Sequence, residues 1–417
     1  MFRRLLIILA AVLLVGGSTV VAAVIAQWPY VSRLWRVSAS NESWSDVVQT
    51  PRFALRARAR LPLSRLAGTE SFAAEGMRRA ADWASQHGAF ALLVAQGETV
   101  LFEQYWQGKD ATSLLGGGGL SRSLVAMLYG IAVAEGRLQL TDEIGQYLDE
   151  WRGDARRHIT VQQLLENTSG LEDAPPALGG DNIRVGLRSR LEFFVAELAD
   201  KNARLKLGNN FAAAALLYKL QHEPGLRFAL SDANAQLAAV VLERAMGQGY
   251  AELLAERIWQ PMGAANALMY MDRPSGMPAA YCCLRARAED FLRLGILLAN
   301  EGVIHGQRIL PAGWVARMAS GSRSNPNYGL QLWTSPLAAG RREFIPGTNL
   351  AATHGDGFAA SDVIWMEGPG GAAVWASPSQ DLAIVYIGGM GTDFDASVLV
   401  NLILRARITP TAAAAAG

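Results

Sequence analysis

The sequence predicts an α+β fold in which strands from the two ends of the chain form one antiparallel sheet around a helical insertion. Two apolar, β-prone runs, 88–95 and 99–106, are separated by a short turn at Gly97, which is the pattern of a hairpin. Two more strand-like runs, 372–376 and 382–388, flank a turn near the other end. The chain between these ends is largely helical, so the two pairs of strands are expected to meet in one sheet.

Apolar periodicity and capping signals predict five helices. Their ranges are 123–135, 160–167, 234–246, 289–300 and 396–405. The first and third end at Gly136 and Gly247, the second opens with a capping box at Thr160, and Asp395 caps the fifth. The segment 124–134 is apolar on nearly every side, which is typical of a helix buried within the protein.

The amino terminus carries the clearest physical signal. Arg3 and Arg4 precede an uncharged stretch, 5–26, which is long enough to span a bilayer. The arginines favour a cytoplasmic N-terminus, and Trp28 and Tyr30 suit the opposite interface. We therefore expect an uncleaved membrane anchor with the main domain on the periplasmic or other extracytoplasmic side. The alternative is a cleaved secretory signal, and the main domain is exported in either case.

This pattern divides the chain into four parts. They are a membrane anchor at 1–27, a linker or partly ordered arm at 28–74, a main domain at 75–408 with a helical lobe at about 131–284, and a disordered tail at 409–417.

Composition argues against several functional classes. Lys and Arg (38) nearly balance Asp and Glu (37), so no long-range positive field attracts nucleic acid, and no nucleic-acid partner is expected. The five histidines form neither a helically spaced pair nor a cluster with cysteine, so neither a metal nor another cofactor is expected. Cys282 and Cys283 are adjacent, and side chains of neighbouring residues on an extended chain point apart, so no disulfide is expected.

Several segments, in order along the chain, resemble the β-lactamase-related serine hydrolases, which include class C β-lactamases, penicillin-binding proteins and 6-aminohexanoate-dimer hydrolases. The matching segments are 114–140, 158–165, 168–171, 224–228, 282–283, 308–311, Trp314, 370–371, 378–379 and 381–382. The resemblance covers about 75–405. It implies an α/β/α sandwich, with an antiparallel sheet flanked by helices, an inserted all-helical lobe and a cleft between the lobes.

The first catalytic motif of that family, Ser-x-x-Lys, opens the buried helix and maps onto Gly119 and Arg122. Glycine offers no nucleophile, and arginine stays protonated at neutral pH, so it cannot serve as a base. The residue types that the chemistry requires are therefore missing at both positions.

The other two motifs are altered as well. The tyrosine of the second motif maps onto Leu230, and the polar residue two positions later maps onto Asp232. The third motif, Lys-Thr-Gly or a variant, maps onto 366–368, where only Gly368 is retained. Three independent losses predict a catalytically inactive homologue. Buried Arg122 is then expected to need an acidic partner, either Asp232 or Glu367.

Two functions follow from this interpretation. An inactive protein would bind a cell-wall fragment, a small amide or ester, or a partner protein in the cleft between the lobes. Alternatively, the chain is an active hydrolase of amides, esters or β-lactams in which Ser121 is the nucleophile, Arg122 holds an anion, and Asp232 or Glu367 is the base. Against this alternative, a shift of two residues turns a helical side chain by about 200°. The segment 353–355 resembles the third motif only superficially and is predicted to be a loop.

Overall fold

The structure is a computed structural model that describes residues 27–39, 51–66, 74–173, 198, 200–336, 338–348, 351–368, 371–389 and 394–407. The predicted anchor, apart from Gln27, and the predicted tail lie outside these residues. Within the described residues, no helix is both long and apolar enough to cross a bilayer.

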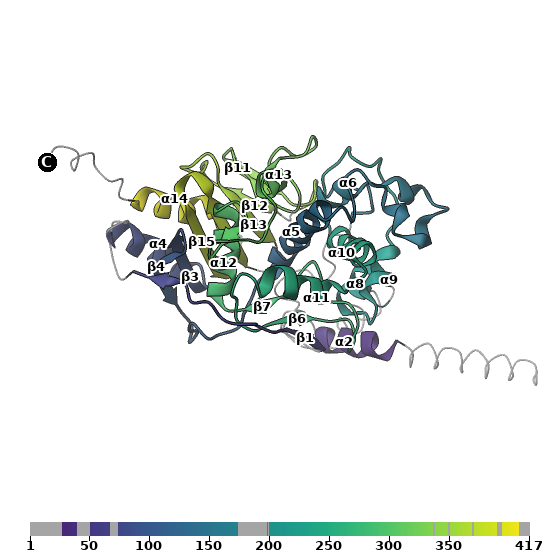
Figure 1. Ribbon diagram of the computed structural model, residues 1–417, viewed down its shortest axis with the longest axis horizontal. Helices are drawn as coiled ribbons and strands as arrows, with labels where there is room; N and C mark the ends of the chain where they lie inside the picture. The colour runs from purple at the N-terminus through teal and green to yellow at the C-terminus, as the bar shows by residue number, and fades with distance from the viewer. Residues whose placement is uncertain are drawn as a thin grey trace, which may run out of the picture.

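The main sheet joins the two ends of the domain, as the sequence predicts (Figure 1). Its strands, in spatial order, are β10 (Trp333–Thr334), β13 (Ile364–Gly368), β14 (Ala372–Ser377), β15 (Leu382–Gly388), β3 (Ala89–Gln96), β4 (Thr99–Tyr105) and β2 (Ser64–Arg65). The late strand β15 pairs antiparallel with the early strand β3, with Ile384 opposite Val94. Every pair in this sheet is antiparallel except β2 with β4.

Helices cover both faces of this sheet, which confirms the predicted sandwich (Figure 1). Successive residues of a strand point to opposite faces. On β3, Leu93 belongs to the apolar cluster that contains α12 (Ala288–Ala299), whereas Leu92 and Val94 belong to the cluster that contains α4 (Ala74–Gln86) and α14 (Ala396–Ala406). The central strands are therefore buried on both sides, which explains their nearly continuous apolar sequences.

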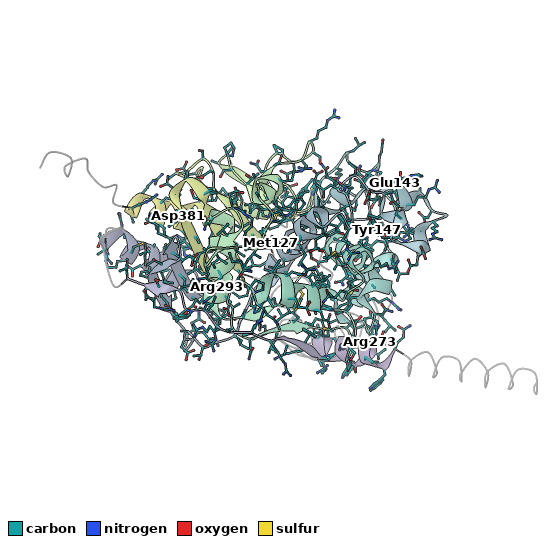
Figure 2. All side chains as sticks on the ribbon, in the orientation of Figure 1. Met127, Glu143, Tyr147, Arg273, Arg293 and Asp381 are labelled. Atoms are coloured by element: carbon teal, nitrogen blue, oxygen red, sulfur yellow. A yellow bond between two sulfur atoms is a disulfide. The ribbon has the colours of Figure 1, made fainter. Side chains whose placement is uncertain are left out.

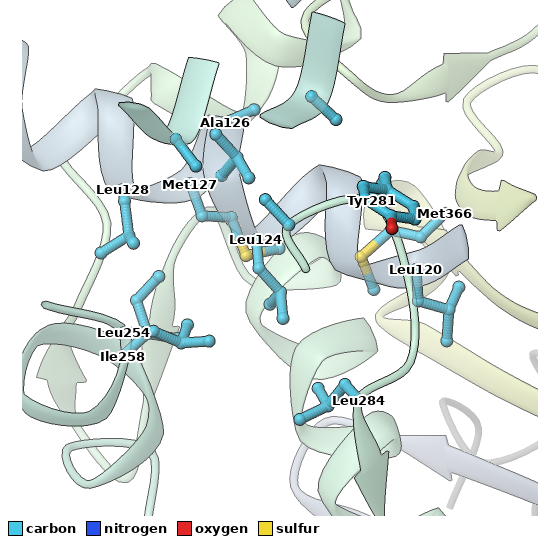
Figure 3. Packing of buried hydrophobic residues seen from close by; sticks show 14 of the residues in the cluster. Leu120, Leu124, Ala126, Met127, Leu128, Leu254, Ile258, Tyr281, Leu284 and Met366 are labelled. Carbon is cyan, nitrogen blue, oxygen red and sulfur yellow. The ribbon is translucent and has the colours of Figure 1, made fainter. Parts of the chain in front are cut away.

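The inserted lobe is mostly helical, but β6 (Ala267–Tyr270) falls within the range predicted to be all-helical, so that part of the prediction was wrong. Its helices are α5 (Ser121–Ala134), α6 (Val161–Leu165), α8 (Lys201–Leu207), α9 (Phe211–Leu216), α10 (Asp232–Met246) and α11 (Tyr250–Leu254), and a π-helical turn, η5 (Ala255–Trp259), follows α11. The predicted capping box at Thr160 is present, and Gly247 ends α10 in the left-handed conformation. Helix α5 is buried along most of its length, and Leu124 and Leu128 lie in one apolar cluster with Leu254 and Leu284 (Figure 3).

Smaller elements complete the described chain. A second sheet has the order β1 (Arg52–Leu55), β6 (Ala267–Tyr270), β7 (Arg285–Ala286) and β5 (Leu115–Gly116). Two hairpins are formed by β8 (Val303–Ile304) with β9 (Gln307–Arg308) and by β11 (Gly340–Glu343) with β12 (Ala351–His354). Helix α13 is Trp314–Ala319, and 3-10 turns are η1 (Gly118–Leu120), η2 (Ile144–Gln146), η3 (Asp149–Trp151), η4 (Ala155–His158) and η6 (Pro378–Gln380).

Within its described residues, the arm predicted at 28–74 includes α2 (Trp28–Ala39), β1 and β2. Helix α2 buries Tyr30, Arg33 and Leu34 against the domain, and β1 pairs antiparallel with β6.

Two predictions about local structure were wrong. Cys282 and Cys283 form a disulfide. The prediction assumed an extended chain, but Cys283 has a φ of 72°, so the backbone turns at this point and neighbouring side chains no longer point apart. The segment 353–355 was predicted to be a loop, but Thr353 and His354 belong to β12, where the short β11 supplies the pairing partner.

Close packing at Gly130 yields a test of the fold. A Cβ atom at this position of α5 would lie 2.5 Å from Cδ1 of Trp314, whose indole nitrogen donates to the carbonyl of Ala126 at 3.0 Å. We expect Gly130→Ala to lower the free energy of unfolding by about 1–3 kcal/mol, because overpacking outweighs the gain in helix propensity. Gly153→Ala is the matched control, since nothing lies within 4 Å of its Cβ position. Equal stabilities of the two variants in urea unfolding would contradict this packing.

Candidate active site

The site lies where the second sheet leads into the buried helix α5. The chain passes from β5 through η1 into α5, and the amide of Gly117 donates to the carbonyl of Leu284 at 2.8 Å. The turn η1 lies against the main sheet, with Cα atoms within 8 Å of Cα atoms in β13 and β14. Gly119 is buried in this turn. The expected position of the nucleophile is therefore inside the protein, beside the third motif, and carries no side chain.

Arg122 occupies the first turn of α5 and is buried. Its Nη2 donates to Oδ1 of Asp232 at the start of α10, which is the predicted ion pair. Ser231, not Asp232, caps α10, because the Ser231 hydroxyl accepts from the amide of Asn234. The Asp232 carboxylate is consequently available for the arginine, and the first and second motif positions meet through a charge pair.

Lys206 of α8 is a third charged residue at this site, which was not predicted from the sequence. Its Nζ lies 3.7 Å from Oδ2 of Asp232, and its side chain is buried. Burial is the main cause that lowers the pKa of Lys206; Arg122 lowers it too, and Asp232 opposes the shift. The only sequence signal was the position of this lysine between Leu205 and Leu207.

Glu367 does not pair with Arg122, so this alternative was wrong. On β13, Met366 lies in the same apolar cluster as Leu120 of η1 (Figure 3), whereas Trp365 lies in the cluster on the other face of the sheet. Because side chains alternate along a strand, Glu367 is directed to the same face as Trp365. There its carboxylate accepts from Arg342 and from the indole nitrogen of Trp365 at 2.8 Å.

The Glu367 cluster is a separate buried group of charged and aromatic side chains. The Arg342 guanidinium lies 3.9 Å from the ring centroid of Trp333, and its Nε donates to Nε2 of His354 at 3.3 Å. Burial, assisted by the charge of Arg342, lowers the pKa of His354 to about 4. His354 is therefore neutral at physiological pH and can accept that hydrogen bond.

Leu230 replaces a hydroxyl with an apolar surface. Its side chain is buried in a cluster with Phe228, Tyr328 and Phe344, and its amide donates to the carbonyl of Phe344 at 2.8 Å. The family's tyrosine would bring an ionisable oxygen to this position. Leu230 cannot donate, accept or transfer a proton.

A polar network not identified from the sequence holds Ser231 in place. Asn167, which follows α6, accepts from the Ser231 amide at 3.0 Å and from the Asn234 side chain at 3.2 Å. Its amide nitrogen donates to the Tyr328 hydroxyl at 3.1 Å, and that hydroxyl donates to Gln331 at 2.9 Å. The network ties the helical lobe to the loop before β10. It thereby fixes the position of Asp232, the next residue along.

Ser121, the alternative nucleophile, is fully buried. Among the described residues, its Oγ has no hydrogen-bond partner. A serine is activated by a base within hydrogen-bond reach. The described residues provide no such base for Ser121.

A small pocket opens on the helical lobe beside the second motif. Leu230, Ser231 and Asn234 contribute to its wall, together with Ser169 and Asp173. The Asp173 carboxylate pairs with Arg227, which also lines the pocket. Within the described part of the chain, no group of three or more His, Cys, Asp or Glu side chains is arranged to hold a metal ion.

Comparison with known proteins decides the family. A sequence profile described as Beta-lactamase matches residues 77–393. The chain belongs to the beta-lactamase family. The 6-aminohexanoate-dimer hydrolase of Paenarthrobacter ureafaciens is 26% identical over 244 residues, which are 56% of this chain and 58% of that relative's length. The chain thus spans less than two thirds of this relative.

Solved structures agree on the beta-lactamase fold. A protein of Bacillus anthracis assigned as a 6-aminohexanoate-dimer hydrolase superimposes with a TM-score of 0.61 at 18% identity, over 82% of this chain and 85% of that protein. A D-alanine carboxypeptidase of Burkholderia cenocepacia superimposes with a TM-score of 0.55 at 19% identity, over 79% of this chain and 97% of that enzyme. At these identities the likeness establishes the fold alone.

The dependence of Arg122 on Asp232 can be measured. Asp232→Asn would leave two buried cations, Arg122 and Lys206, without the carboxylate that lies between them. We expect the free energy of unfolding to fall by about 3 kcal/mol, as when one partner of a buried pair is removed. Asp356→Asn is the matched control, because its pair with Arg405 is exposed and should contribute less than about 1 kcal/mol. Equal losses in the two variants would show that the Arg122 pair is not a buried one.

The lowered pKa of His354 predicts a specific pH dependence. The unfolded chain binds a proton at this histidine below about pH 6.5, whereas the folded chain does so only near pH 4. The unfolded state therefore holds more protons in this window, and stability falls as the pH falls from about 6.5 to about 4. The expected loss from this group between pH 7 and pH 5 is about 2 kcal/mol. In urea unfolding, His354→Gln should abolish this pH-dependent loss of unfolding free energy. His158→Gln, at an exposed position, should retain the loss.

Proposed function

We propose that this protein is a catalytically inactive beta-lactamase-family protein that binds a ligand at the family's site without cleaving it. The observation that carries the proposal is the replacement of nucleophile and base by Gly119 and by the Arg122–Asp232 ion pair. Acyl transfer in this family needs an attacking oxygen and a group that accepts its proton. Gly119 supplies no oxygen, and Arg122 stays protonated.

The surroundings of the motif positions support the same proposal. Leu230 contributes an apolar surface in place of a proton-transfer group, and Glu367 is held by Arg342 and Trp365 on the other face of the sheet. The remaining candidate for a nucleophile, Ser121, is fully buried. A relocated serine would need both access to substrate and a base, and the surroundings of Ser121 favour neither.

The ligand that we propose is a small amide or a peptide fragment of the cell wall. The relatives are named for action on a 6-aminohexanoate dimer and on D-alanine, which points to amide-bonded ligands. The uncharged stretch at 5–26 supports an exported protein that is held at the membrane by its N-terminal segment.

Labelling with a serine-directed fluorophosphonate tests the absence of catalysis. We expect neither this reagent nor a penicillin to form a stable adduct with the purified protein, as read by intact mass, whereas an active serine hydrolase in the same assay is labelled. Gly119→Ser alone should not restore turnover, because Arg122 still cannot accept the proton and Leu230 still replaces the tyrosine.

The matched control for this experiment is Ser121→Ala. Stoichiometric labelling of the natural chain that disappears in Ser121→Ala would establish the relocated-nucleophile hydrolase instead. In that case the proposal of an inactive binding protein would be wrong.

A further inference from the structure

Helix α2 is fixed rigidly to the helical lobe by a buried arginine. The Arg33 guanidinium donates to the carbonyls of Leu207 at 3.0 Å, Gly208 at 2.6 Å and Asp272 at 2.8 Å. These carbonyls come from two separate segments of the domain. An arginine held by three main-chain acceptors cannot move without losing all three bonds in a buried position. The direction of α2 is therefore set by the domain.

Tyr30 is not available to contact a membrane. It was expected to stand at the membrane interface with Trp28, but only 2% of its surface is exposed, and its hydroxyl donates to the carbonyl of Leu198. Because 28–74 was predicted to be an arm, its sequence did not indicate which aromatic residues face outward.

Two tryptophans are exposed on the face of α2 that is opposite the buried residues. Trp28 is 59% exposed and Trp35 is 47% exposed. Seven residues correspond to almost two full turns, so both rings leave α2 on the same side. Single exposed apolar residues are common on protein surfaces. Two tryptophans on the same face of one helix form a cluster, and exposed apolar clusters mark contact surfaces. Tryptophan is also the residue type enriched where a protein meets the membrane–water interface.

The chain that precedes α2 indicates what this face contacts. The uncharged stretch 5–26, long enough to span a bilayer, ends directly before Gln27. Arg36 is exposed on α2, and the half-exposed side chain of Arg273 adjoins Asp272, whose carbonyl holds Arg33. Figure 2 shows Arg273 at the same end of the molecule as α2. Basic side chains near a bilayer are attracted to anionic headgroups.

We propose that α2 lies flat on the outer surface of the membrane, with Trp28 and Trp35 in the headgroup region, so that the helical lobe is docked on the lipid. This rests on the proposed membrane anchoring but goes beyond it. A tether alone leaves the domain free to turn, whereas a lobe held through Arg33 has one orientation. The partner is a lipid surface that contains anionic phospholipid.

Quenching by brominated lipid tests this geometry on the full-length chain. The protein is reconstituted in vesicles of phosphatidylcholine and phosphatidylglycerol whose acyl chains carry bromine close to the headgroup, and tryptophan emission is compared with that in unbrominated vesicles. Trp28→Phe and Trp35→Phe keep an apolar ring but remove the emitter. If α2 lies flat, each variant loses a comparable share of the lipid-dependent quenching, and the double variant loses most of it.

The matched control is the double variant Trp83→Phe and Trp106→Phe. Trp83 lies in α4 and Trp106 directly follows β4, at the opposite end of the molecule from α2 (Figure 1). This variant should retain the quenching of the natural chain. All variants carry conservative changes, and their urea unfolding curves show whether each is folded.

Three results would overturn the proposal. Loss of quenching in Trp28→Phe but not in Trp35→Phe would mean that α2 points away from the lipid, because seven residues carry a helix about 10 Å along its axis. Loss in the control pair would place the other end of the domain on the membrane. In both cases vesicle sedimentation would still show an anchored protein. A chain that fails to sediment with vesicles would overturn the anchoring as well.

Discussion

The pairing of β15 with β3 is the constraint on which the rest of the domain depends. It joins segments that are almost 300 residues apart, as in Ile384 opposite Val94, and places them at the centre of the main sheet. The helical lobe is inserted between β4, which follows β3, and the returning strands β13 and β14, which precede β15. The site forms where the outgoing chain, at η1 and α5, passes the returning strand β13.

The sequence predicted those parts of the fold whose patterns are local. Apolar runs and turn residues predict the hairpin of β3 and β4 and the buried helix α5. The capping box at Thr160 can be recognised from four consecutive residues. The ladder from β15 to β3 could be predicted because both hairpins needed a partner. Segment α2 was missed because Arg33 is buried through contacts with distant carbonyls, and nothing in its own sequence reveals those acceptors.

The sequence predicted where the motif positions lie along the chain better than it predicted which residues contact them. The family register located Gly119, Arg122 and Asp232, and the Arg122–Asp232 pair follows from the need of a buried charge for compensation. The sequence did not show whether Asp232 or Glu367 would pair with Arg122. On β13, Glu367 is directed to the face of the sheet opposite the site, so it cannot reach Arg122. Lys206 and Asn167 were missed because their roles arise only when α8 and the end of α6 are brought to α10.

The main sheet ends on both sides in very short strands. Strand β10 has two residues, Trp333–Thr334, and β2 has two, Ser64–Arg65. Unpaired strand edges are templates on which another chain can add itself, and short edges that carry charge or are followed by proline resist this. Here Arg65 belongs to one edge strand and Pro336 follows the other. The charge on one edge strand and the proline after the other make both strands poor templates for an added strand, even when many copies are crowded at one place.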